Sequence, residues 1–176
     1  MQSLISQNNN IHFIGIGGNK MIEKGLVSIE KMEKLSIIGF LEVIKHLRFF
    51  SNLLKRVLKN IEEAKPQHII LIDYPGFNLI LAKKIKKSFN IPITYYISPQ
   101  IWAWKEKRIE IIKKYIDKMI VIFEFEKIWY QKRGVDAEYV GHPFLDIWDK
   151  NKTDDLIKKY KIDQTQPILT LFPGSR

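Results

Sequence analysis

Four short segments of the chain carry side chains that a plain connection between helices and strands does not require. They lie at 15–20, 73–78, 98–107 and 141–143, and each follows a short apolar run. In an open parallel sheet, ligands bind in the crevice beyond the carboxyl ends of the strands. If the apolar runs are parallel strands, all four segments lie at one edge of the sheet, and we expect the functional site there.

Asp73 is the candidate for acid–base chemistry. It follows the apolar run HIILI (68–72) and precedes Pro75-Gly76. A carboxylate at the tip of a buried strand is partly desolvated, which raises its pKa and suits it to act as a general base. The alternative is that the carboxylate only accepts backbone N–H bonds within its own turn. The residues alone leave both interpretations open.

The segment SPQIWAWKEKR (98–108) has an unusual composition for a loop. Trp102 and Trp104 stand two positions apart, and the basic residues Lys105, Lys107 and Arg108 follow. Paired indoles suit an apolar or sugar-like ligand, and the cations suit its phosphate. The alternative is that one indole packs into the core and the basic residues form the solvated face of a helix.

In the segment Gly141-His142-Pro143, the histidine could act as a base, contact a phosphate or serve as a hinge residue. The alternative is that the segment is only a bend in the backbone. No second histidine or carboxylate cluster supplies metal-ligand spacing, so we predict no metal site. The glycines of 15–18 do not continue as a dinucleotide fingerprint because Lys20 occupies the position of the third glycine, and there is no phosphate-binding P-loop. We therefore expect no bound cofactor.

Hydrophobic periodicity predicts alternating strands and helices. Strands are expected at 11–16, 68–73, 91–97, 118–123, 137–140 and 168–172. Helices are expected at 36–64, 78–89, 105–115, 125–133 and 154–160, with mixed helical character at 21–32 and a break at Ser51-Asn52. This order predicts an α/β fold with a parallel sheet, and the uniformly apolar strands indicate helices on both faces. The polar run 149–155 is the predicted domain boundary, which makes 1–148 the first domain.

Charge and composition limit the partners. The chain has 176 residues, 29 Lys+Arg against 19 Asp+Glu and a net charge of +10, with no cysteine. Disulfides, thiolate metal sites and a cysteine nucleophile are thereby excluded. A positive net charge favours an anionic partner, such as nucleic acid, an anionic membrane surface or a phosphorylated ligand. The alternative is that the charge only reflects a genome-wide bias in amino-acid composition. No charge-free stretch is long enough to span a bilayer and no signal peptide is evident, which favours a cytoplasmic location.

The predicted helix around 40–59 combines basic and aromatic residues. Its cations include Arg48, Lys55 and Lys59, and Phe49-Phe50 stand side by side. A helix of this kind suits the plane of a membrane surface. The alternative is a helix that packs on the core and exposes its other face to solvent, but two adjacent phenylalanines are hard to direct into one core.

These segments, in this order, resemble the lipid-A-disaccharide synthase family, whose members are GT-B glycosyltransferases. The stretches that carry the resemblance are FIGIGGNKM (13–21), LSIIGFLEVIKHL (35–47), IDYPGFNLILAKKIKK (72–87), YYISPQIWAWKEKR (95–108), FEKIWYQKRGV (125–135), YVGHPFLD (139–146) and LFPGSR (171–176). The spacing of SP-x-x-WAW-K-x-KR, GHP and PGSR is the specific part.

The resemblance implies a reaction and a place for it. The family condenses UDP-2,3-diacylglucosamine with 2,3-diacylglucosamine 1-phosphate and releases UDP, at the cytoplasmic face of the inner membrane. It implies that Asp73 deprotonates the acceptor hydroxyl and that Arg176 meets the UDP phosphates. Trp102, Trp104, Lys105 and Arg108 match the acceptor-side loop. Gly141, His142 and Pro143 are then expected at the hinge between domains. The expected partners are the UDP-sugar donor, the acylated sugar phosphate acceptor and an anionic membrane surface, but no nucleic acid.

Two departures from the family pattern predict a truncated chain. The family begins with an extra strand and a G-x-x-S-G-D turn that this sequence lacks, and the chain stops at Arg176. We therefore expect 149–176 to be a linker and the first strand of a C-terminal nucleotide-sugar domain, and we expect no transferase activity from these residues alone.

Two other functions compete with this interpretation. One is a different UDP-sugar GT-B transferase of cell-envelope synthesis. The other is a non-enzymatic basic module that binds nucleic acid, which the charge supports but no nucleic-acid motif does.

Overall fold

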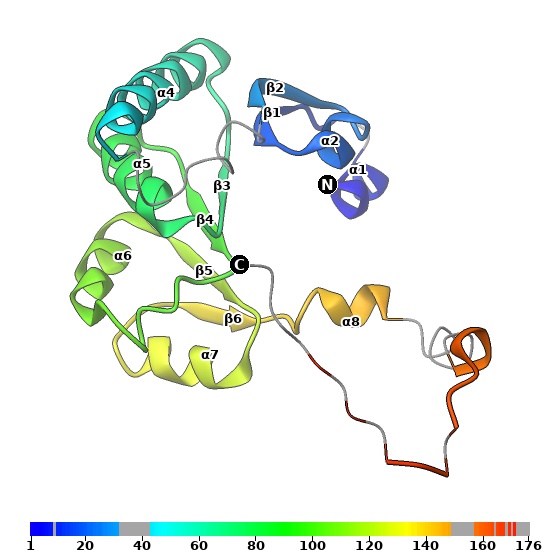
Figure 1. Cartoon of the computed structure of the whole chain (residues 1–176). Coiled ribbons are helices and arrows are strands. Elements are labelled where there is room, and N and C mark those ends of the chain that lie inside the picture. The colour runs from blue at the N-terminus through cyan, green and yellow to red at the C-terminus, as the bar shows by residue number, and fades with distance from the viewer. Residues whose placement is uncertain are drawn as a thin grey trace.

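The computed structural model describes residues 1–8, 10–31, 43–148, 157–163, 165–167, 169 and 171. Helices and strands alternate along most of this part of the chain (Figure 1). The elements are α1 (Gln2–Gln7), β1 (Phe13–Gly17), α2 (Asn19–Ile22), β2 (Leu26–Lys31), α4 (Val43–Ala64), β3 (Ile69–Ile72), α5 (Pro75–Ser88), β4 (Ile93–Tyr96), η1 (Glu106–Arg108), α6 (Ile109–Tyr115), β5 (Lys118–Val121), α7 (Glu124–Gln131), β6 (Ala137–Tyr139) and α8 (Phe144–Ile147).

All the described strands pair in parallel, which confirms the predicted α/β class. They form two sheets, β1-β2 and β3-β4-β5-β6. Leu71 of β3 stands opposite Tyr95 of β4, and Tyr95 stands opposite Met119 of β5. Each strand of the larger sheet follows the previous one through a helical connection, so the segments that follow β3, β4, β5 and β6 all emerge at the same edge.

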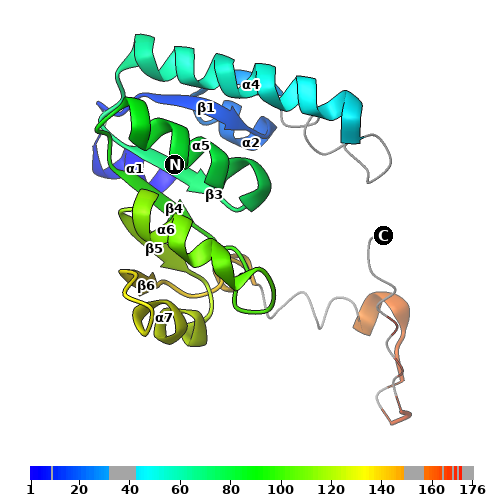
Figure 2. The same cartoon turned by 90° about the vertical axis from the view of Figure 1, so that its left-hand side faces the viewer.

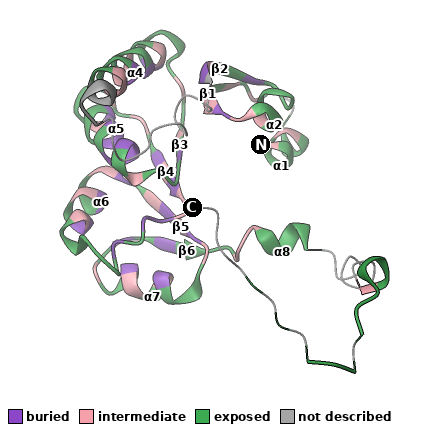
Figure 3. Cartoon of the chain, viewed as in Figure 1, coloured by how far each residue is buried: buried purple, intermediate pink, exposed green. Residues whose placement is uncertain are grey.

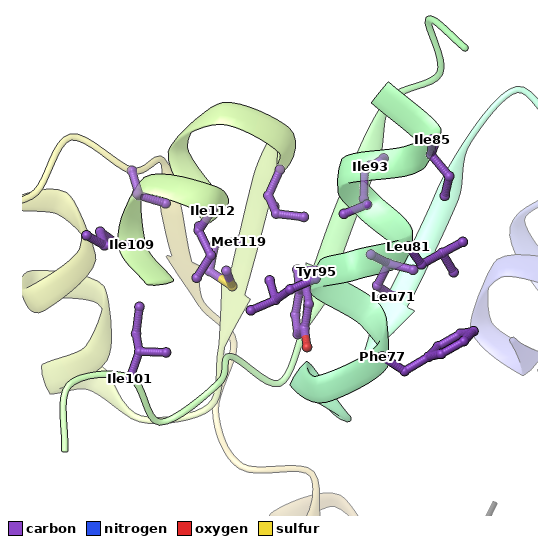
Figure 4. Packing of buried hydrophobic residues seen from close by; sticks show 14 of the residues in the cluster. Leu71, Phe77, Leu81, Ile85, Ile93, Tyr95, Ile101, Ile109, Ile112 and Met119 are labelled. Carbon is purple, nitrogen blue, oxygen red and sulfur yellow. The ribbon is translucent and has the colours of Figure 1, made fainter. Parts of the chain in front are cut away.

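Helices α4, α5, α6 and α7 lie on one face of the larger sheet (Figures 1 and 2). The buried strand residues Leu71, Tyr95 and Met119 point into this layer, where they meet the helices (Figure 4). Ile70 and Ile72 alternate with them and stay nearly half exposed. The prediction of helices on both faces is therefore wrong for the described residues, because an apolar strand can still leave alternate side chains on an open face.

Helix α4 is continuous, so the predicted break at Ser51-Asn52 is wrong. Leu53, Val57 and Ile61 recur every four residues and are buried, and this stripe holds the helix against the core. Phe49 and Phe50 both pack against the same core. The two adjacent phenylalanines are thus accommodated by the domain itself, contrary to expectation.

The sequence predictions are least accurate at 21–32 and near the C-terminus, where the described residues are mostly exposed (Figure 3). The helical character expected at 21–32 is wrong after Ile22, since Gly25 turns the chain with a φ of 91° and 26–31 forms β2. Of the strand expected at 168–172, the described residues Leu169 and Leu171 are exposed and belong to no strand. The predicted boundary at 149–155 lies outside the described residues, and the predicted helix at 154–160 is described only as 157–160.

Candidate functional site

Asp73 lies in the tight turn between β3 and α5. Asp73 and Tyr74 both adopt left-handed backbone conformations, with φ of 45° and 48°. Pro75 then opens the helix, where its fixed φ suits the first position. The Asp73 amide donates to the carbonyl oxygen of Tyr96 at 3.0 Å, so the turn remains tied to the neighbouring strand β4.

Two buried side chains hold the backbone of this turn. The side-chain amide of Asn78 donates to the carbonyl oxygens of Ile72 at 3.1 Å and Asp73 at 2.7 Å. The Tyr95 hydroxyl donates to the same Asp73 carbonyl at 2.5 Å. Sequence reasoning missed both residues, although a polar Asn78 inside an otherwise apolar first helical turn is a readable signal.

Tyr95 also connects Asp73 with Arg108. Its side chain is fully buried and stands between β3 and β5, with the hydroxyl directed toward the start of α5 (Figure 4). Burial raises the pKa of the Tyr95 hydroxyl, the negative charge of Asp73 raises it further and the positive charge of Arg108 opposes the increase. Charges from the Asp73 turn and from Arg108 therefore act on the same buried hydroxyl.

The Asp73 carboxylate itself is exposed, so the expected desolvation is wrong. Within the described ranges it accepts no hydrogen bond, so the alternative of a carboxylate bonded within its own turn also fails. The strained backbone is held through its carbonyl oxygen and amide instead. This leaves both carboxylate oxygens available to water or a ligand.

Arg108 lines a groove of about 510 Å³ between α5 and α6. We call this the α5–α6 groove; its lining residues are Pro75, Gly76, Leu79, Ile80, Lys83, Lys84, Lys87, Arg108 and Ile111. Pro75 and Gly76 follow directly after the Asp73 turn. The structure thus brings Arg108 to the Asp73 side of the site.

Trp102 is anchored at its polar end by a buried carboxylate. Its indole N–H donates to Oε1 of Glu126 at 3.1 Å, and its ring meets the edge of Phe125 at 5.0 Å between centroids. Glu126 is only 1% exposed, and its Oε2 accepts the amide of Phe123 at 3.3 Å, which caps α7. Sequence reasoning missed Glu126, although a glutamate at the third position of a helix is a capping signal.

A row of rings continues from Trp102 to the 141–143 segment. Its members are Trp102, Phe125, Phe123, His142 and Phe144, with successive centroid distances of 5.0, 5.9, 5.6 and 5.1 Å. We call it the aromatic row. It brings two of the four predicted loops together at the carboxyl edge of β5 and β6.

The 141–143 segment forms a bend. Gly141 has a φ of 85°, which favours glycine, and Nδ1 of His142 accepts the amide of Phe144 at 3.2 Å. Pro143 then precedes α8. The segment is therefore a turn, and the hydrogen bond between the His142 side chain and the Phe144 amide closes it.

Trp104 and Lys105 contact each other. Trp104 is 62% exposed, and the Lys105 ammonium lies 4.4 Å from the centre of its ring. Within the described residues, no hydrogen bond joins Asp73 to Trp102 or Trp104. Arg176 lies outside the described residues.

In the described part of the chain, no three histidine, aspartate or glutamate side chains are grouped so that they could hold a metal ion. None of the helices described there is both long and apolar enough to cross a bilayer.

The chain is a Rossmann-like α/β protein. Its strands form parallel βαβ units, and polar and aromatic side chains gather at the carboxyl edge of these strands. A sequence model described as Lipid-A-disaccharide synthetase matches residues 1–176, and the chain belongs to this family. A lipid-A-disaccharide synthase from Coxiella burnetii is 40% identical over 176 residues, covering 99% of this chain and 46% of the relative. Lipid-A-disaccharide synthase 1 of Legionella pneumophila is 41% identical over 171 residues, covering 95% and 44%.

A third relative, the lipid-A-disaccharide synthase of Trichlorobacter lovleyi, is 41% identical over 165 residues, covering 93% of this chain and 43% of the relative. The chain thus spans less than half the length of these curated relatives.

Proposed function

We propose that this chain supplies the acceptor-side domain of a glycosyltransferase of lipid A biosynthesis. The reaction would join UDP-2,3-diacylglucosamine to 2,3-diacylglucosamine 1-phosphate, giving the lipid A disaccharide and UDP. The observation that carries the proposal is the family match over residues 1–176, together with relatives named for this activity. Neither another UDP-sugar transferase nor a nucleic-acid module is favoured by these relatives.

Asp73 is the proposed general base. The acceptor hydroxyl oxygen would attack the anomeric carbon of the donor while its proton passes to the Asp73 carboxylate. The bond between that carbon and the UDP oxygen breaks, and UDP leaves with the electron pair. An exposed carboxylate on a backbone fixed by Tyr95 and Asn78 supports this role. A positioned general base typically accelerates a reaction by about 10²–10⁴-fold.

The remaining predicted residues take binding roles in the proposal. Trp102 and Trp104 would contact the acylated sugar acceptor, and Lys105 and Arg108 its phosphate. Arg176 would stabilise the charge that develops on the leaving UDP.

The proposal also assigns the two predicted parts of the chain to two domains. The range 1–148 is assigned to the acceptor-side domain, with Gly141, His142 and Pro143 at its hinge. The range 149–176 is assigned to the linker and the start of the nucleotide-sugar domain.

We also place the protein at the cytoplasmic face of the inner membrane, as a peripheral protein that binds an anionic surface rather than nucleic acid. The net charge of +10 and the exposed Arg48, Lys55 and Lys59 of α4 support this location. Each cation near anionic lipid contributes about 1 kcal/mol.

A segment replacement tests the function. The matched segment of the Coxiella burnetii relative is replaced by residues 1–176, and UDP release is measured with both lipid substrates, with either one alone, and with a different sugar acceptor. We expect release only with both substrates, and none from the 176-residue chain by itself. A folded replacement protein that releases no UDP, or that prefers the other acceptor, would contradict the proposal.

A further inference from the structure

The α5–α6 groove extends well beyond the proposed catalytic turn. It begins at Pro75 and Gly76, at the first turn of α5, and continues to Lys87 near the end of that helix. The 12 helical steps from Pro75 to Lys87 correspond to about 18 Å. Helices α5 and α6 run side by side in the outer layer (Figure 2). The lining residues Lys83, Lys84 and Lys87 are exposed, so the groove opens to solvent. Its volume of about 510 Å³ is within the range of small-ligand sites.

The charges in the groove have one sign. Lys83, Lys84, Lys87 and Arg108 line it, and no acidic residue does. None of these four forms an ion pair within the described residues, whereas their neighbour Lys86 pairs with Asp117 at 2.6 Å. The groove therefore concentrates positive charge that the fold leaves uncompensated, which favours an anionic ligand.

The floor and one wall of the groove are apolar. Leu79 is buried, Ile111 is half-buried, and Ile80 is 53% exposed beside the lysines. An exposed isoleucine within a cluster of cations suits a ligand that joins an anionic group to an apolar one. A purely polar polyanion such as duplex DNA would leave this apolar surface in water.

We propose that the α5–α6 groove binds the headgroup of an anionic phospholipid. Lys83, Lys84 and Lys87 surround the phosphate, and Ile80 and Ile111 contact the glycerol and the first methylene groups. The groove is a site separate from the exposed cations of α4. Because the test measures binding and not UDP release, this proposal and the proposed transferase function can fail independently.

The test is sedimentation of the 176-residue chain with phosphatidylcholine vesicles, with and without phosphatidylglycerol. The groove variant carries Lys83→Gln, Lys84→Gln and Lys87→Gln. The control variant carries Lys20→Gln, Lys24→Gln and Lys132→Gln, which removes the same charge from three exposed lysines on other elements. We expect the groove variant to lose affinity for the anionic vesicles by about tenfold or more and the control by less than about threefold. Equal losses in the two variants would overturn the proposal.

Two further arms identify the source of the phosphate. Glycerol 3-phosphate and inorganic phosphate are added as competitors, and duplex DNA replaces the vesicles. We expect neither small anion to displace the chain at concentrations that leave the ionic strength unchanged. Displacement by them, or a loss in the groove variant that affects DNA binding more than vesicle binding, would overturn the lipid assignment.

A measurement on the unaltered chain removes any dependence on how the variants fold. Lysines are acetylated in the presence and absence of anionic vesicles, and the modified positions are found by mass spectrometry. We expect the vesicles to protect Lys83, Lys84 and Lys87 but not Lys20, Lys24 and Lys132. Uniform protection, or none at the groove, would contradict the proposal.

Discussion

The hydroxyl of Tyr95 donates a hydrogen bond of 2.5 Å to the main-chain carbonyl oxygen of Asp73. Asn78 donates to the same oxygen from α5 at 2.7 Å. Two buried residues of the core therefore fix the backbone of the proposed base while its carboxylate stays exposed. The buried core thus fixes the backbone of Asp73, while the carboxylate lies at the surface. A general base needs to be positioned in this way.

Removing this hydroxyl should cost stability. Tyr95→Phe deletes a buried hydrogen bond, and we expect the free energy of unfolding to fall by about 1 kcal/mol in urea titrations. Tyr96→Phe is the matched control, because Tyr96 is only half-buried and its hydroxyl makes no hydrogen bond within the described residues. It should change the value by less than about 0.5 kcal/mol. Equal effects of the two variants would show that the Tyr95 bond does not hold the turn.

The chain should lose stability at alkaline pH. Burial raises the pKa of Tyr95 and of Tyr130, and the charges of Asp73 and Glu126 respectively add to the increase. The unfolded chain releases these protons near its ordinary tyrosine pKa of 10.0, whereas the folded chain retains them. Unfolding is therefore favoured as the pH rises above about 10, and this contribution is constant below it.

The measurement is the urea midpoint at a series of pH values on either side of about 10. Tyr95→Phe should make the alkaline decline shallower, because one of the two buried phenols is gone. If the alkaline decline is identical in Tyr95→Phe and in the unsubstituted chain, groups other than Tyr95 cause it.

The two tryptophans of the 98–108 segment should respond differently to substitution. Trp102→Phe removes the N–H that bonds Oε1 of the buried Glu126, and we expect a loss of about 1–3 kcal/mol in stability. Trp104 is largely exposed, so Trp104→Phe should cost less than about 0.5 kcal/mol. Urea titration of both variants decides the point, and a loss for Trp104→Phe as large as for Trp102→Phe would be inconsistent with this geometry.

The sequence predicted the central βαβ units well because their signals are local. The apolar runs that became β3, β4 and β5, and the stripe of Leu53, Val57 and Ile61 on α4, are readable without tertiary information. Strand β2 was missed because it exists through parallel pairing with β1 across a turn at Gly25. Whether a segment forms a strand depends on the segment that it pairs with, so local periodicity predicts such strands poorly.

The position of Asp73 directly after a strand could be predicted, but its surroundings could not. Asp73 does follow a strand, yet its exposure depends on how the turn is held, and that depends on Tyr95 from the next strand. Likewise, the partner of Trp102 is Glu126, which lies 24 residues further along the chain. Side-chain partners supplied by distant segments cannot be deduced from spacing within one segment.

The central claim is that Asp73 acts as the general base, and its most direct test is turnover of the segment-replacement protein carrying Asp73→Asn. Asp136→Asn is the control, since Asp136 is an exposed aspartate that precedes β6, at the opposite edge of the sheet. We predict that Asp73→Asn lowers kcat by about 10²–10⁴-fold without weakening donor binding, while Asp136→Asn leaves both unchanged. Turnover within a few-fold of the unsubstituted protein in Asp73→Asn would contradict the account.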